Sequence, residues 1–169
     1  MTDNLAIRLA QRVMATRAFA TLAPHVIPHL DRALHRLTGG RKMLLTLPRP
    51  KVGLILTTTG AKSGQLRTTP LVCVPEEHEG TWLLVGSNFG KPGHPAWTAN
   101  LRKHPDASIS WAGRDIRVTA AQLVGQQRDQ AWADIVAFWP PYGAYQERTE
   151  REIRIFRLTP RPSPSALTP

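Results

Sequence analysis

The middle of the chain constrains the fold most, because between Lys51 and Leu123 it consists of short runs rich in β-branched and aromatic residues, separated by turn residues. The runs that we expect to be strands are residues 52–58, 66–74, 82–87, 107–111 and 114–124. Short links favour antiparallel neighbours, whereas a doubly wound parallel sheet needs a helix after each strand, which this chain lacks. The pattern therefore predicts a small β-barrel, whose closure leaves no exposed sheet edge.

Helical patterns flank and interrupt these runs. Residues 95–104 and 126–139 each have helical character, and the pair Pro140-Pro141 should end the second helix. A sixth strand is expected at residues 153–158. The fold class indicated is α+β, mainly β.

The N-terminal third differs in charge from the rest. Residues 1–50 hold eight Lys or Arg against two acidic residues, and apolar residues within 5–14 recur at helical spacing. Pro24 and Pro28 should interrupt this helix before a second short helical piece at residues 30–37. A basic amphipathic lead of this kind can lie on an anionic bilayer, but a helix packed on its own domain has the same pattern.

Three parts of the chain are therefore expected. Residues 1–45 form a basic amphipathic helical extension, and residues 46–160 form the barrel domain. The last eleven residues contain four prolines, which suggests that residues 161–169 are a disordered tail.

Composition limits the partners and the setting. The 169 residues carry 22 Lys or Arg against 12 Asp or Glu, and the net charge of +10 favours phosphates, polycarboxylates, nucleic acid or an anionic membrane. Nucleic acid is disfavoured because no reader motif accompanies the basic residues. No run reaches the roughly 18 apolar residues of a membrane span and no secretion signal is visible, so a cytoplasmic location is expected.

Cysteine and histidine give little scope for metal or thiol chemistry. A single cysteine, Cys73, excludes an internal disulfide, and its place in a β-run indicates a buried, inert thiol. His25 and His29 have no Cys or carboxylate nearby at ligand spacing, so no metal site is expected. Arginines with acidic residues between them indicate a solvated face; they are Arg114, Arg117, Arg148, Arg151, Arg154 and Arg157.

The first candidate site is the turn between the first two predicted strands. Gly60 and Gly64 flank Lys62 and Ser63, so that backbone N–H groups can converge on an anion while Lys62, Ser63 and Arg67 add donors. The spacing is not that of a P-loop. The alternative is an ordinary glycine-containing hairpin with solvated cations.

The second candidate site follows the third predicted strand. A turn of Gly86, Ser87 and Asn88 precedes a helix that begins near Pro95 and leaves its first N–H groups free for an anion or a ring carbonyl. Trp97 could pack on a planar heterocycle or fill the core.

The third candidate site follows Trp139. Tyr142 and Tyr145 lie three residues apart after the proline pair and can point the same way, lining a pocket with ring surface and hydroxyl groups. Packing against the barrel rim is the alternative.

Together these stretches resemble the deazaflavin-dependent nitroreductase family, oxidoreductases that use coenzyme F420 on a split β-barrel related to the pyridoxamine-phosphate-oxidase type. The matching motifs are Leu-Thr-Thr-Thr-Gly-Ala-Lys-Ser-Gly-Gln-Leu-Arg-Thr-Thr-Pro-Leu at 56–71, Gly-Ser-Asn at 86–88, His-Pro-Ala-Trp-Thr-Ala-Asn-Leu at 94–101, Tyr-Gly-Ala-Tyr-Gln at 142–146 and Arg-Glu-Ile at 151–153. Phe89 stands where a second glycine is frequent in the family, and Thr98 where a tyrosine is common.

The resemblance also implies site residues. Those matching cofactor-binding positions are Ala61, Lys62, Ser63, Arg67, Thr68, Thr69, Pro70, Leu71, Val72, Gly86, Ser87, Asn88, Ala96, Trp97, Asn100 and Tyr142. Those near the substrate are Trp139, Tyr142 and Tyr145. Lys62 and Arg67 would be the principal cations at the phosphate and acidic tail of the coenzyme.

The implied activity is hydride transfer from reduced F420 to an electron-poor acceptor such as a quinone, enone or nitroaromatic, with Tyr145, Tyr142 or a water delivering the proton. Trp139 replaces a tyrosine of some nitroimidazole-reducing members, so that activity does not follow. A non-catalytic carrier or sensor of deazaflavin, flavin or haem is the alternative. A homodimer and membrane contact through residues 5–37, on the inner face of the membrane, are further expectations.

Overall fold

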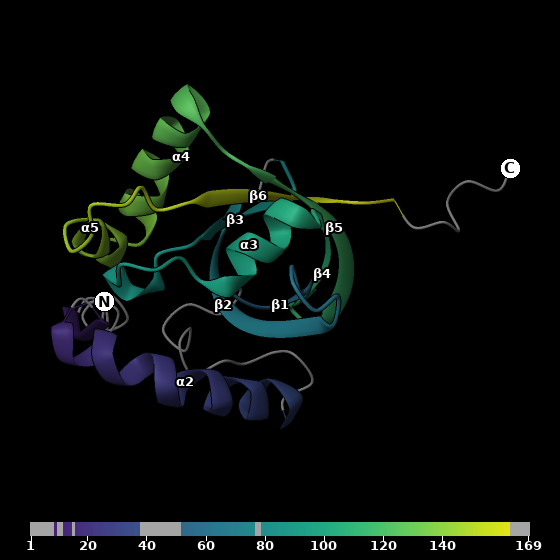
Figure 1. Ribbon diagram of the computed structural model, residues 1–169, viewed down its shortest axis with the longest axis horizontal. Helices are drawn as coiled ribbons and strands as arrows, with labels where there is room; N and C mark the ends of the chain where they lie inside the picture. Colours follow the sequence, from purple (N-terminus) through teal and green to yellow (C-terminus); the bar gives the residue numbers. More distant parts are fainter. Residues whose placement is uncertain (1–8, 10–11, 15, 38–51, 77–78, 163–169) are drawn as a thin grey trace, which may run out of the picture.

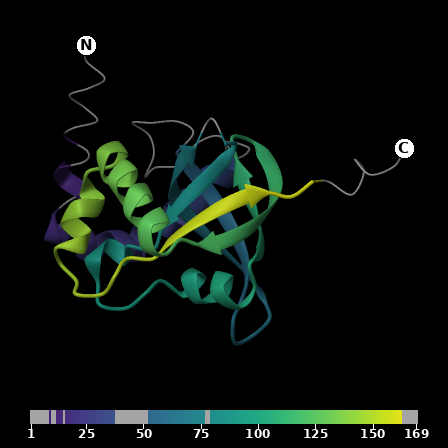
Figure 2. The same ribbon diagram turned by 90° about the horizontal axis from the view of Figure 1, so that it is seen from above.

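The computed structural model describes Leu9 and residues 12–14, 16–37, 52–76 and 79–162. In Figure 1 a β-barrel is accompanied by the long helix α2 (Arg17–Leu37) along one side. Helices α4 (Gly125–Phe138) and α5 (Pro141–Gln146) lie together at one end of the barrel, as the view from above in Figure 2 also shows.

The barrel is closed and antiparallel throughout. Its strands are β1 (Gly53–Thr59), β2 (Leu66–Glu76), β3 (Thr81–Val85), β4 (Asp106–Trp111), β5 (Arg114–Gln122) and β6 (Ile155–Pro160). They are arranged in the order β1-β2-β3-β6-β5-β4, and β4 pairs with β1 to close the barrel. The α+β class and the barrel expected from the resemblance are confirmed, with each predicted strand present and its ends displaced by a few residues.

Two cores sit on opposite faces of the barrel wall, and β3 separates them. All five residues of β3 are buried. Because successive side chains of a strand point to opposite faces, Trp82 and Leu84 pack inside the barrel, whereas Leu83 and Val85 join a second core under α4 and α5. The second core places α5 against the barrel wall.

The helices predicted at residues 95–104 and 126–139 are present, and two further short ones were not predicted. The helix predicted within residues 5–14 lies mostly outside the described residues. Helix α3 (Ala96–Lys103) contacts β1, and α4 contacts β6 and α5. The short α5 begins directly after the proline pair, because Pro141 occupies a first-turn position where its missing N–H costs nothing. The turn after β3 forms a short 3-10 helix, η2 (Asn88–Gly90).

The expected interruption at Pro24 and Pro28 is wrong, because α2 is helical without a break from Arg17 to Leu37. A proline inside a helix costs about 3 kcal/mol through its missing N–H and its ring. The two prolines are four residues apart, so the missing donors fall on the same side of the helix. Packing of α2 against β2, with Asp31 fully buried, supports the helical geometry despite them.

Both expected domain boundaries fall near residues outside the described part. The boundary between residues 45 and 46 lies within 38–51, and residues 163–169 of the expected tail also lie outside it. The first residue of that tail, Arg161, donates its backbone N–H to the Arg117 carbonyl at 2.8 Å. Within the described residues, the search for a helix with the length and apolarity of a membrane span finds none.

Candidate active site

A cavity of about 250 Å³ opens between the barrel wall, α2, α3 and α5. The residues that line it are Met14, Asp31, Thr69, Pro70, Leu71, Val72, Val85, Ser87, Asn88, Phe89, Pro95, Trp97, Trp139, Tyr142 and Tyr145. Apolar and aromatic side chains predominate, and a few polar side chains lie among them. Such a lining suits a planar ring with hydrogen-bonding atoms on its rim.

The structure divides the predicted site residues into two groups. Those that it brings together in the cavity are Thr69, Pro70, Leu71, Val72, Ser87, Asn88, Trp97, Trp139, Tyr142 and Tyr145. Those outside it are Ala61, Lys62, Ser63, Arg67, Thr68, Gly86, Ala96 and Asn100. The first five of these lie at the tip of the β1–β2 hairpin or just after it, and the last three lie at the end of β3 and in α3.

Strand β2 connects the hairpin tip to the cavity. Exposed Arg67 lies near its start, and half-buried Thr69, Pro70 and Leu71 follow. At about 3.4 Å per residue, Arg67 and Leu71 lie about 14 Å apart along the strand. One extended ligand could therefore reach both the cationic turn and the cavity.

The hairpin tip is a concave turn, but much of its backbone is already used. The N–H groups of Gly60 and Gly64 donate to the carbonyls of Gln65 and Gly60, each at 2.8 Å. The N–H of Gln65 donates to the Ser63 hydroxyl at 3.3 Å. Within the described part of the chain, the N–H groups of Lys62 and Ser63 have no acceptor. The predicted anion site therefore reduces to two backbone donors and the exposed cations beside them.

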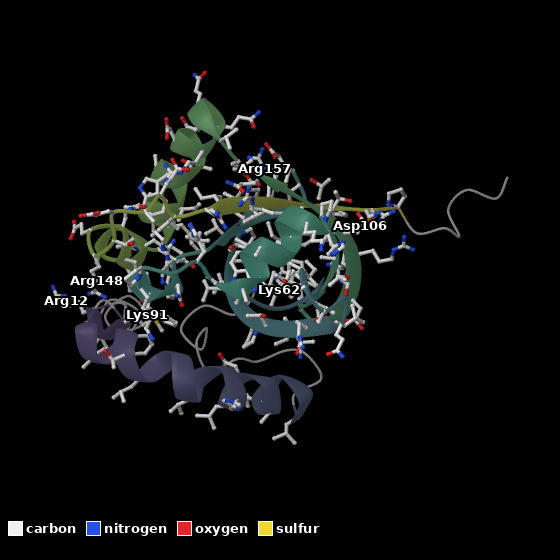
Figure 3. The ribbon with its side chains drawn as sticks, in the orientation of Figure 1. Arg12, Lys62, Lys91, Asp106, Arg148 and Arg157 are labelled. Atoms are coloured by element: carbon white, nitrogen blue, oxygen red, sulfur yellow. The ribbon has the colours of Figure 1, made fainter. Side chains whose placement is uncertain are left out.

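Two residues of α3 fix this turn to the barrel. The Asn100 side chain accepts a hydrogen bond from the Ala61 N–H at 2.9 Å and donates to the Thr58 hydroxyl at 3.0 Å. The Lys103 ammonium donates to the Ala61 carbonyl at 2.7 Å. Figure 3 shows Lys62 beside α3. Buried Asn100 thus holds the turn in place from inside the protein.

Arg151 holds the turn after β3. Its guanidinium donates to the carbonyls of Ser87 at 2.6 Å, Lys91 at 3.0 Å and Gly86 at 3.2 Å. It also lies 3.2 Å from Nδ1 of His94. The expectation that Arg151 belongs to a solvated face is therefore wrong, since the residue is half-buried and binds the loop that lines the cavity. No local sequence signal joins residues this far apart in the chain.

The expectation of a solvated face is also wrong for Arg157. Its guanidinium makes a two-point hydrogen bond with the Glu76 carboxylate, at 2.7 and 2.8 Å. This contact raises the pKa of Arg157, with burial opposing the effect. It ties β6 to the end of β2, away from the cavity (Figure 3).

Both tyrosines line the cavity from α5 and are almost fully buried. The Tyr145 hydroxyl donates to the Met14 carbonyl at 2.8 Å, and burial raises its pKa to about 12, opposed by the nearby Arg148. Burial raises the pKa of Tyr142 further. Among the described residues, none accepts a hydrogen bond from the Tyr142 hydroxyl. Both phenols are neutral at physiological pH, and only that of Tyr142 is uncommitted.

The buried thiol of Cys73 lies inside the barrel. Burial raises its pKa to about 12, which keeps the thiol protonated. Trp97 is also packed on the barrel core, with its ring 5.7 Å from that of Phe156, while it lines the cavity. The interpretation that Trp97 fills the core is therefore confirmed, and its place in the cavity lining is compatible with packing on a bound heterocycle.

The N-terminal part of the chain contributes residues that sequence reasoning missed. Met14 and Asp31 line the cavity, and Asp31 is fully buried on α2. Their distance along the chain from the cofactor motifs left no pattern to find them. The predicted extension is thus also a wall of the site.

The comparisons with known proteins agree on one family. Residues 30–160 match the F420H(2)-dependent quinone reductase family. An F420H(2)-dependent quinone reductase of Mycobacterium tuberculosis (strain ATCC 25618 / H37Rv) is 34% identical over 140 residues, covering 78% of this chain and 89% of that protein.

Two solved structures are similar in both sequence and fold. One, described as a domain-swapped dimer, is 32% identical with a TM-score of 0.61 and covers 76% of this chain and 95% of its own. The other, an F420-H2 dependent reductase, is 36% identical with a TM-score of 0.58 and covers 64% of this chain and 95% of its own. The chain therefore belongs to the F420H(2)-dependent quinone reductase family, and is an oxidoreductase whose cofactor is coenzyme F420.

Proposed function

We propose that this protein transfers a hydride from reduced F420 to a quinone bound in the cavity beside α5. The observation that carries the proposal is the arrangement along β2, where an exposed cationic turn leads directly into an aromatic cavity. An elongated coenzyme with an anionic tail and a planar ring fits these two features.

The residues present fit such a coenzyme at both ends. Neither Lys62 nor Arg67 forms an ion pair with any described carboxylate, so both remain available to phosphate and carboxylate groups. The free N–H groups of Lys62 and Ser63 point to the same anionic end. At the other end the ring would lie against Thr69 to Val72, Ser87 and Trp97.

When bound, the reduced deazaflavin supplies the hydride, and the protein supplies position and a dry site. Trp139 and Tyr142 offer ring surface for an acceptor. The uncommitted Tyr142 hydroxyl is the proposed hydrogen-bond donor to the acceptor oxygen, since burial favours its neutral form. The same raised pKa makes Tyr142 a poor acid, so water is the proposed source of the proton. Tyr145 is assigned to positioning, because its hydroxyl already holds Met14.

The acceptor range is proposed to extend to enones and nitroaromatics, which share the electron-poor planar character of quinones. The test is oxidation of reduced F420, followed by absorbance, with a panel of these three classes. Turnover with a quinone is expected. Saturable F420 binding without turnover of any acceptor would instead favour a carrier or sensor, and absence of binding would overturn the proposal.

Contact with an anionic membrane surface is a further part of the proposal. Four apolar residues on one side of α2 are 49% to 85% exposed; they are Leu22, Val26, Leu30 and Leu37. Asp31 follows Leu22 by two and a half turns, so this apolar side faces away from the cavity. A lipid-soluble quinone in such a membrane would then be separated from the cavity by α2.

A homodimer is also proposed, supported by the dimeric description of one similar structure. Light scattering on the pure protein, at concentrations spanning a hundredfold range, would measure the mass. A monomeric mass throughout would contradict this part alone.

A further inference from the structure

Phe89 has a backbone conformation that bulky residues rarely adopt. Its φ is 56° and its ψ is 26°, in the left-handed region where a side chain is crowded by its own backbone. Asn88 before it also has a positive φ of 48°. Asparagine tolerates this region, but phenylalanine does so only when its surroundings enforce it.

The surroundings of the turn do enforce it. Arg151 binds the carbonyls of Ser87 and Lys91 on either side of η2. The Asn88 side chain donates to the Gly93 carbonyl at 2.8 Å. A Cβ on Gly90 would lie 2.7 Å from the Tyr145 carbonyl, so the turn lies directly against α5. The strained geometry is thus fixed by contacts on both sides of Phe89.

The result of this strain is the position of one ring. The Phe89 ring lies 5.9 Å from that of Tyr145 and 6.0 Å from that of Phe19 in α2, edge to face in both cases. It lines the cavity, whereas Phe19 does not. Phe89 therefore stands between α2 and α5 with one side toward the cavity.

We infer that Phe89 sets the upper width of the acceptor that this protein reduces. The inference rests on the proposed function, since it concerns the acceptor of the same cavity. A cavity of about 250 Å³ is smaller than the roughly 300–1,000 Å³ of most small-molecule sites, so the loss of one ring changes its capacity substantially.

The test compares acceptors of different width at equal charge. The variants are Phe89→Gly, which removes the ring and suits the backbone, and Phe89→Leu, which shortens the side chain. The matched control is Phe19→Leu, which loosens the same aromatic contact from α2 without altering the cavity lining. Another control, Phe138→Leu, removes ring surface from the second core at a residue that is not itself part of the cavity lining.

Two readouts are measured with 1,4-naphthoquinone-2-sulfonate and anthraquinone-2-sulfonate. The first is kcat/KM for oxidation of reduced F420, and the second is Kd from quenching of the tryptophan fluorescence of the protein, to which the cavity residues Trp97 and Trp139 contribute. The preference is the ratio of the value for the three-ring quinone to that for the two-ring quinone. In Phe89→Gly this preference should rise about tenfold or more, both in kcat/KM and in binding affinity, which is the scale on which pockets discriminate by size. The preference of Phe89→Leu should lie between those of the wild type and Phe89→Gly, and both controls should keep the wild-type preference.

The outcomes separate the two claims. If the wild type turns over neither quinone, the proposed function is wrong, and the Kd ratio alone then decides the role of Phe89. An unchanged Kd ratio in folded Phe89→Gly would overturn the inference. So would an equal change in Phe19→Leu, because that would assign the effect to α2 packing and not to the ring of Phe89.

Discussion

Arg151 shows how one side chain can determine the shape of a loop. Its guanidinium binds three backbone carbonyls and contacts His94, and it does so from a segment far along the chain from η2. In Arg151→Ala these acceptors lose a charged donor, and we expect a loss of about 2 kcal/mol in the free energy of unfolding. Urea denaturation measures it.

The control for this prediction is Arg117→Ala, because Arg117 is exposed. A similar loss in both variants would contradict the role given to Arg151. Arg151→Lys should recover only part of the stability, since an ammonium cannot reach the same set of carbonyls in one plane.

Lys62 and Arg67 are the residues whose removal should weaken F420 binding directly. Each of Lys62→Ala and Arg67→Ala should lose about 1–3 kcal/mol of binding free energy, as expected for a charge-assisted hydrogen bond. Fluorescence titration with F420 measures the affinity, and the loss should shrink as salt is raised. Unchanged affinity in both variants would place the anionic tail elsewhere.

His94 should make stability depend on pH. Burial, then the positive charges of Arg154, Arg151 and Arg102, lower its pKa from 6.5. The unfolded chain therefore takes up a proton at a higher pH than the native protein, and the stability contributed by neutral His94 is lost as pH falls below about 6.5.

The measurement for His94 is the urea midpoint between about pH 7.5 and pH 5.5, for wild type and His94→Gln. Glutamine keeps a hydrogen-bond acceptor for Arg151 without titrating. The wild type should lose more stability on acidification than the variant, and parallel curves would refute the assignment.

Among single residues of the cavity, the sequence was sufficient to predict only those that lie within continuous motifs. Thr69 to Val72, Ser87, Trp97 and Tyr142 could be predicted because each lies in a short motif that matches a family pattern. Met14, Asp31 and the role of Arg151 could not, because tertiary packing alone brings them to the site.

Among the elements, the strands were the easiest to predict, since each joins β-branched residues to clear turn signals. The predictions of helix ends were wrong where proline was interpreted only as a residue that ends a helix. Pro141 starts α5, and α2 passes through two prolines because its packing on β2 compensates. Local propensity cannot supply that information.

The link between α3 and the β1–β2 turn leads to a prediction for elements in contact. In Asn100→Ala the Ala61 N–H and the Thr58 hydroxyl lose their partners, which should cost about 2 kcal/mol of stability. The turn should also loosen, so F420 affinity should fall although Asn100 lies outside the cavity lining. Faster hydrogen exchange at Gly60 and Gly64, whose N–H groups are hydrogen-bonded within the turn, would report the loosening.

Lys103→Ala is the matched control, because Lys103 also binds Ala61 but from an exposed position. Its effect on stability should be clearly smaller. If Asn100→Ala exchanged like the wild type at the turn, Asn100 would not be the residue that holds it.

On the scale of the whole molecule, α2 has two different sides. Asp31 faces the cavity, whereas Leu22, Val26 and Leu30 face solvent, so this helix belongs both to the site and to the outer surface. An exposed apolar stripe on a protein of net charge +10 should bind a surface that is apolar beneath a negatively charged layer.

We therefore expect the protein to cosediment with vesicles that contain phosphatidylglycerol, and much less with pure phosphatidylcholine. In the double variant Leu22→Ser and Leu30→Ser, each lost side chain should remove about 1 kcal/mol of partly buried apolar contact, so partitioning should fall about tenfold or more. Val124→Ser is the control, because Val124 is similarly exposed but lies before α4. If the double variant and the wild type bound the vesicles equally, α2 would not be the part that contacts the membrane. Unchanged F420 affinity in both would then leave the active site as described.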